Sequence, residues 1–153
     1  MLINGERVNE PFRRELRYPR LNGDIVLQAT SVSCAKDFED LYPVPEPPSE
    51  KDAKGNVIRV LHDDPDYHKR INERTICKFD YQVIRSLENV KWETVDLQDP
   101  KTWKNWRMEA VEAGLSDLEV LDVINKVIET LQPSVELVER MKKDFLATQG
   151  QKG

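Results

Sequence analysis

Residues 114–131 read GLSDLEVLDVINKVIETL, and this stretch decides the character of the C-terminal half of the chain. Ser116 and Glu119 have the spacing of a capping box, in which each side chain accepts a hydrogen bond from the backbone N–H of the other residue. After this start, apolar residues recur at helical spacing and form one face: Leu118, Leu121, Ile124, Ile128 and Leu131. We therefore expect an amphipathic helix over 117–131.

Helices are expected on both sides of this segment. Pro133 and Ser134 interrupt the chain, and a last helix should cover 135–147. Earlier in the sequence, two Asp-Pro pairs each supply an aspartate N-cap and a proline at the first helical position. These pairs predict helices over 65–87 and 100–113. The C-terminal half is therefore expected to be mainly helical, with short loops.

The N-terminal part of the chain has a different pattern. Segments rich in β-branched residues predict strands over 24–32 and 57–61, and a further short strand is expected over 90–95. Four prolines between positions 43 and 48 exclude a helix or a central strand and predict an extended connector. The sequence therefore predicts an α+β fold.

We expect the chain to have two parts that meet near residue 62. The first, residues 1–62, holds the strands and the proline-rich connector, with an irregular beginning over 1–20, one helical turn near 37–42 and a polar turn over 49–56. The second, residues 63–153, is the helical half with the short strand inside it, and it ends in a polar tail from Gln149 to Gly153.

The overall composition is that of a folded, acidic protein. The 153 residues are 39% hydrophobic and 33% charged, with a net charge of −5. This charge disfavours nucleic-acid binding through a broad basic face. The first residues lack the pattern of a secretory signal, and no apolar run reaches the ~18 residues of a membrane span. Cys34 and Cys77 favour two reduced thiols in the cytosol, although one disulfide stays open.

Both histidines lie in the run from His62 to His68, which also carries three carboxylates. One interpretation is a metal site, and the other is a helix N-terminus at which Asp64 caps free N–H groups. We favour the cap, because no third nitrogen or thiolate ligand is near and the run does not match a calcium loop. The chain also lacks a phosphate-binding loop, an HExxH pair and a nucleophile elbow. We expect no metal, no cofactor and no catalytic residues.

Two groups of residues allow both a binding and a structural interpretation. The basic run 12–20 interleaves arginines with Phe12 and Tyr18, as a nucleic-acid arm does, but Glu15 and the acidic remainder favour an ordinary solvated surface. The second group is the three tryptophans: Trp92, Trp103 and Trp106. An exposed tryptophan would serve as an aromatic anchor in a partner's groove. Large aromatics more often anchor small cores, so we expect at least two of the three tryptophans to be buried.

Read in order, a set of short segments covering about residues 37–147 resembles the tail assembly chaperones of long-tailed bacteriophages. The segments are Asp37-Phe38-Glu39, Tyr42-Pro43 with Pro45, Pro47 and Pro48, Lys54-Gly55, Asp64-Pro65 with Tyr67, Ser86-Leu87, Lys91-Trp92-Glu93, Asp99-Pro100 with Thr102 and Trp103, Ala113-Gly114-Leu115-Ser116 with Glu119, and Phe145-Leu146.

The resemblance implies a protein that is not an enzyme and that acts in the host cytoplasm. Such chaperones bind the helical, aggregation-prone tape measure protein and help tail tube subunits to polymerise around it. Members often exist in two forms made by ribosomal frameshifting, and this chain would match the short form. Two other functions stay open: a structural virion component, such as a tail or connector subunit, and an interaction domain of unrelated bacterial origin.

The partner surface is expected in the C-terminal half, because two short helices joined at Pro133 bury only part of their apolar stripes against each other. The remaining apolar surface must contact the other helices or a partner, and homo-oligomerisation stays open. The candidate contact residues are Leu121, Ile128, Leu137, Met141 and Phe145.

Overall fold

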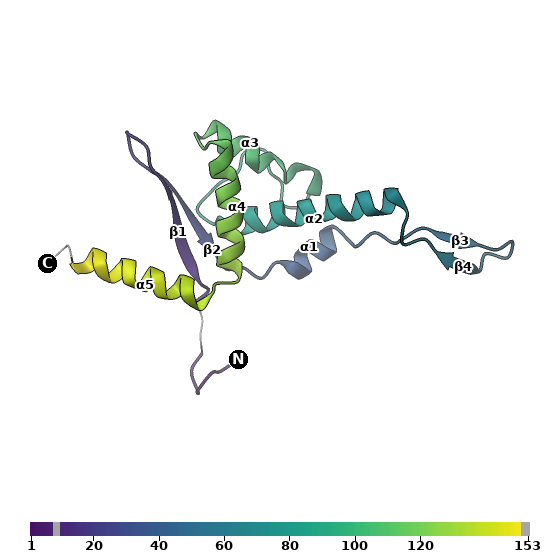
Figure 1. Ribbon diagram of the computed structural model, residues 1–153, viewed down its shortest axis with the longest axis horizontal. Helices are drawn as coiled ribbons and strands as arrows, with labels where there is room; N and C mark the ends of the chain where they lie inside the picture. Colours follow the sequence, from purple (N-terminus) through teal and green to yellow (C-terminus); the bar gives the residue numbers. More distant parts are fainter. Residues whose placement is uncertain (8–9, 151–153) are drawn as a thin grey trace.

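The computed structural model describes residues 1–7 and 10–150, and its fold is α+β, as the sequence predicted. Two separate antiparallel β-hairpins lie in the N-terminal half, and most of the helices lie in the C-terminal half (Figure 1). In chain order the elements are β1 (Arg13–Tyr18), β2 (Ile25–Thr30), α1 (Ala35–Leu41), β3 (Ser49–Lys51), β4 (Val57–Val60), α2 (Pro65–Ser86), the 3-10 helix η1 (Pro100–Thr102), α3 (Asn105–Glu112), α4 (Asp117–Leu131) and α5 (Val135–Gly150).

Three of the four predicted helices are confirmed. Helix α4 has the predicted bounds, α2 ends one residue early, and α5 continues to Gly150, so part of the predicted tail is helical and residues 151–153 lie outside the described residues. The predicted helix over 100–113 is divided into η1 and α3. Thr102 explains the division, because its hydroxyl donates to the backbone oxygen of Asp96 at 3.0 Å and holds the first turn to the preceding loop.

The expectation of an irregular segment over 1–20 is wrong for β1. This strand pairs antiparallel with β2, in a register that places Arg13 opposite Thr30 and Tyr18 opposite Ile25. Leu16 is 1% exposed and faces the helices together with Tyr18, while Glu15 and Arg17 point outward. The sequence analysis missed this strand because the segment is mostly charged, which masks the apolar–polar alternation typical of a half-buried strand.

The second hairpin lies at the far end of α2 from the core (Figure 1). The predicted strand over 57–61 is confirmed as β4, and the predicted polar turn over 49–56 contains its partner, β3. Asp52 closes the turn, since its carboxylate accepts backbone N–H groups of Lys54 and Asn56 at 2.9 Å each. All residues of both strands are exposed.

The predicted strand over 90–95 is wrong, since this segment is irregular. Its backbone N–H groups find a side chain instead of a neighbouring strand: those of Glu93 and Thr94 donate to the Glu109 carboxylate at 2.7 and 3.1 Å. Trp92, in the same segment, packs edge-on against Trp106 with 6.4 Å between ring centroids. The alternating residues of this segment therefore form a loop that packs on α3 instead of a strand.

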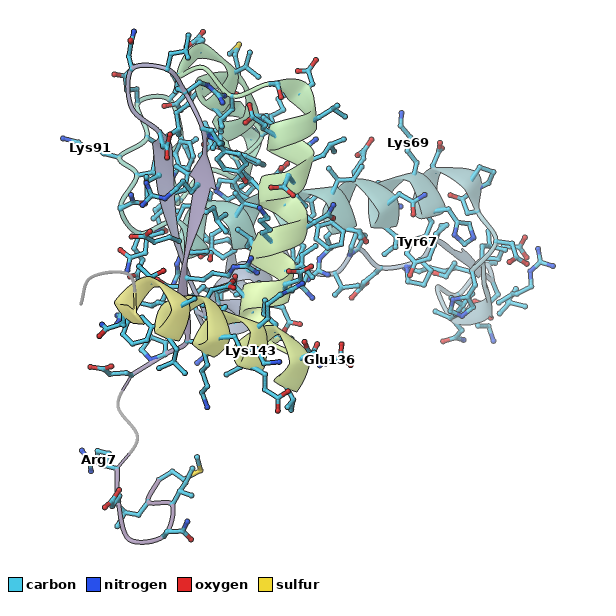
Figure 2. All side chains as sticks on the ribbon, turned by 60° about the vertical axis from the view of Figure 1, so that its left-hand side comes forward. Arg7, Tyr67, Lys69, Lys91, Glu136 and Lys143 are labelled. Carbon is cyan, nitrogen blue, oxygen red and sulfur yellow. The ribbon has the colours of Figure 1, made fainter. Side chains whose placement is uncertain are left out.

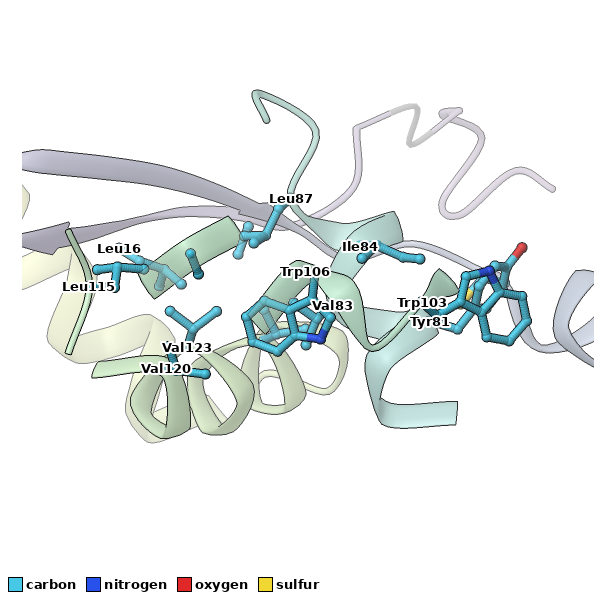
Figure 3. Packing of buried hydrophobic residues seen from close by; sticks show 14 of the residues in the cluster. Leu16, Tyr81, Val83, Ile84, Leu87, Trp103, Trp106, Leu115, Val120 and Val123 are labelled. Atoms are coloured by element: carbon cyan, nitrogen blue, oxygen red, sulfur yellow. The ribbon is translucent and has the colours of Figure 1, made fainter. Parts of the chain in front are cut away.

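One hydrophobic core joins residues from both sides of position 62 (Figure 3). Leu16 of β1 belongs to the same cluster as Trp106 of α3 and Val123 of α4. Trp103 and Trp106 are both fully buried, which confirms the structural interpretation of at least two tryptophans. The hairpin β1–β2 and the helices α2, α3 and α4 therefore fold around a shared interior, from which the hairpin β3–β4 and most of α5 project (Figure 1).

Candidate functional site

Helix α4 turns a different face to the core than the sequence analysis favoured. Its buried residues are Val120, Val123, Val127 and Thr130. From the expected stripe, Leu118 is 78%, Leu121 is 55% and Ile128 is 39% exposed, whereas Ile124 and Leu131 are partly buried. The helix therefore has two apolar stripes, and the one that contains two of the candidate contact residues faces outward.

Three polar contacts join α4 to the β1 side of the molecule. Arg14 donates to Glu129 at 3.1 Å, and the Tyr18 hydroxyl donates to Asp122 at 3.0 Å. Beyond the strand, Arg20 forms an ion pair with Glu119, the capping-box residue. These acceptors lie along one edge of α4, beside the buried valine stripe, and the leucine and isoleucine stripe lies on the outer side.

The same contacts bear on the basic run over 12–20. Each of its arginines lies beside a carboxylate: Arg13 beside Glu88, Arg14 beside Glu129, Arg17 beside Glu15 and Asp24, and Arg20 beside Glu119. A phosphate backbone is bound by cations that exchange small counterions for phosphates. Here the arginines already contact carboxylates of their own chain, which weakens the nucleic-acid interpretation.

Helix α5 is anchored at its start and exposed beyond it. The Ser134 hydroxyl accepts the backbone N–H of Leu137 at 3.1 Å, and the Leu137 side chain is 4% exposed. Farther along, Phe145 and Leu146 are 62% and 68% exposed. Figure 2 shows the helix, which carries the labelled Glu136 and Lys143, crossing below α4 and the hairpin β1–β2. The apolar face of α5 is therefore largely free of intramolecular contacts after its first two turns.

An open apolar groove of about 420 Å³ runs along this face. Phe12, just before β1, forms one side, and Val138, Met141 and Phe145 are among the α5 residues that line it. Sequence periodicity identified Met141 and Phe145, but it missed Phe12, which meets α5 only through the fold. Of the five candidate contact residues, Leu137 is buried as the anchor of α5, whereas Leu121, Ile128, Met141 and Phe145 are accessible.

The run from His62 to His68 is organised around a helix cap. The Asp64 carboxylate accepts the backbone N–H of Tyr67 at 2.9 Å, as the capping interpretation predicted. Within residues 1–7 and 10–150, no group of three or more His, Cys, Asp and Glu side chains is placed to hold a metal ion.

The two cysteines are free thiols in partly apolar surroundings. Burial raises the pKa of Cys34, and burial likewise raises the pKa of Cys77. Because the thiolate is the reactive form of cysteine, a raised pKa lowers the reactivity of both thiols at neutral pH. The arrangement fits packing of these side chains better than nucleophilic chemistry.

None of the helices in the described part of the chain combines the length and the apolar composition needed to cross a membrane. The exposed features described above are the apolar faces of α4 and α5 and the projecting hairpin β3–β4. Comparison of the chain with protein-family models, with curated proteins and with solved structures finds no match.

Proposed function

We propose that the protein is a bacteriophage tail assembly chaperone, which binds the tape measure protein and assists the tail tube subunits in the host cytoplasm. The observation that carries the proposal is the apolar face of α5, where Met141, Phe145 and Leu146 flank an open groove. The resemblance of residues 37–147 to that family supports the same function. Both lines of support point to protein binding rather than to chemistry.

The energetics favour a helical partner for this face. A 16-residue helix with few tertiary contacts is marginal in water, because helix stability in proteins comes mainly from packing of the apolar face. Covering Phe145 and Leu146 would contribute about 1–2 kcal/mol each, since both keep well over half of their surface in water. An amphipathic segment laid along α5 would stabilise both helices, as in other helix-in-groove complexes.

Co-expression with the tape measure protein of the same phage tests the proposal. The wild-type chain should keep that protein soluble, and Phe145→Asp should release it into the insoluble fraction while the variant itself stays folded by circular dichroism. The matched control is Met108→Asp on α3, a side chain that is 59% exposed and lies outside the groove. A tape measure protein that is equally soluble without the chain refutes the proposal.

Mass spectrometry of purified phage particles separates a chaperone from a structural subunit of the virion. A chaperone should be missing or sparse in finished particles. Stoichiometric copies of this chain in the particle would instead identify a tail or connector subunit.

A further inference from the structure

A second groove, of about 470 Å³, lies between the middle of α2 and the C-terminal end of α4. Its apolar residues are Phe79 from α2 with Ile128 and Leu131 from α4. Phe79 and Ile128 are 38% and 39% exposed, so part of each side chain faces the groove rather than the core. Ile128 belongs to the outward stripe of α4, and this groove is where that stripe meets another helix.

Two basic residues of α2, Arg74 and Lys78, also line this groove and lie one helical turn apart. The Arg74 Nε donates to the backbone oxygen of Tyr42 at 2.9 Å, and its guanidinium carbon lies 4.7 Å from the centre of the Phe38 ring. These contacts hold the cation in place without neutralising it.

The charge around the groove is one-sided. None of the described residues that line it carries a carboxylate, although the chain has 28 acidic and 23 basic residues. Glu129, next to Ile128, is engaged by Arg14 instead. Neither Arg74 nor Lys78 forms an ion pair within residues 1–7 and 10–150. The groove therefore combines an apolar surface with uncompensated positive charge in an acidic protein.

We infer that this groove binds an amphipathic helical segment of the partner in which carboxylates flank a large apolar anchor residue. The anchor would pack on Phe79 and Ile128, and the flanking carboxylates would lie beside Arg74 and Lys78. The inference rests on the proposed function, because it specifies the chemistry of the partner's segment. A nucleic acid is a poorer occupant, since an apolar floor gives nothing to phosphates and the net charge of −5 repels them.

Fluorescence anisotropy with the full chain and two labelled peptides tests the inference. Each peptide is a helix of about 18 residues, or about five turns, with leucines on one face; glutamates flank the leucines in one peptide and lysines in the other. The glutamate peptide should bind about tenfold or more tightly than the lysine peptide, and its affinity should fall as salt is added. Lys78→Glu should weaken the glutamate peptide about threefold to tenfold.

The matched control is Lys69→Glu, which places the same change on α2 outside the groove (Figure 2). It should change the affinity for the glutamate peptide less than about twofold. Equal affinity for the two peptides, an equal effect of the two substitutions, or tighter binding of a labelled oligothymidine each overturns the inference. If the wild-type chain fails this test but still keeps the tape measure protein soluble, the groove assignment is wrong and the proposed function stands. If the wild-type chain does not keep the tape measure protein soluble, the proposed function itself is refuted.

Discussion

The Arg20 guanidinium lies 2.6 Å from Glu119, across 99 positions of sequence. The same carboxylate oxygen accepts the backbone N–H of Ser116 at 3.0 Å and so completes the capping box of α4. Arg20 also donates to the backbone oxygen of Gly114 at 2.7 Å. A single carboxylate therefore starts the helix and ties it to the segment that follows β1.

The first prediction concerns acid stability. Hydrogen bonds from Arg20 and from the Ser116 backbone lower the pKa of Glu119 from 4.5 to about 2. Because the pKa is depressed in the folded state, the stabilisation is present above about pH 4.5 and is lost as the pH falls toward 2. Melting temperatures should therefore fall over this range, and less steeply for Glu119→Gln. The control Glu112→Gln should follow the wild-type curve; identical curves for all three proteins would contradict the linkage.

The second prediction concerns Asp80, which is 2% exposed. Its carboxylate accepts the Trp106 indole N–H at 2.8 Å and the Arg107 Nε–H at 3.0 Å. Asp80→Ala leaves the buried indole N–H without an acceptor and removes the ion pair of Arg107, so it should lower the free energy of unfolding by about 3 kcal/mol in urea denaturation. Asp80→Asn keeps an acceptor for the indole and should cost less than Asp80→Ala. Equal losses for the two variants would show that the indole hydrogen bond contributes nothing.

The third prediction concerns the start of α2. Asp64→Ala removes the cap on the Tyr67 N–H and should lower the free energy of unfolding by about 1 kcal/mol. Asp66→Ala, in the first turn of the same helix, should cost less because it removes a charge but no cap. Equimolar zinc or calcium should leave the melting temperature unchanged, and a clear rise would reveal a metal site in this run.

The fourth prediction concerns the attachment of α5. Leu137→Ala empties the buried contact at the start of the helix and should lower the free energy of unfolding by about 2 kcal/mol. Limited trypsin digestion should then cleave earlier at Arg140 and at Lys142. Phe145→Ala, at an exposed position on the same helix, should leave stability and cleavage unchanged. If Phe145→Ala destabilises the chain as much as Leu137→Ala, α5 is packed along its whole length.

Helix starts could be predicted because their signals are local. The capping box at Ser116 and the aspartate cap at Asp64 both act within one turn, and α2 and α4 begin where those residues place them. The strand β1 could not be predicted, because Leu16 and Tyr18 become a buried pair only when the helices cover them.

Which apolar stripe of α4 points to the core could not be predicted for a similar reason. Its two apolar stripes are both compatible with helical periodicity, and the contact that helps to choose between them, Arg14 with Glu129, spans 115 positions. The segment over 90–95 alternates like a strand, but Glu109 supplies the acceptors that a neighbouring strand would have supplied. In the candidate site, Met141 and Phe145 followed from helical spacing, whereas Phe12 came from the fold.

The apolar packing of α2 against the core begins at Cys77, so the twelve residues from Pro65 to Ile76 carry the helix about 18 Å beyond that packing. The hairpin β3–β4 is attached to the outer, N-terminal end of this part of α2 (Figure 1). The distance of the hairpin from the core and its rotation about the α2 axis are consequently set by helix length. Four inserted residues would move the hairpin outward by about 6 Å and rotate it by about 40° around the axis. A partner that contacts the hairpin would therefore be held at a distance from the core that the length of α2 determines.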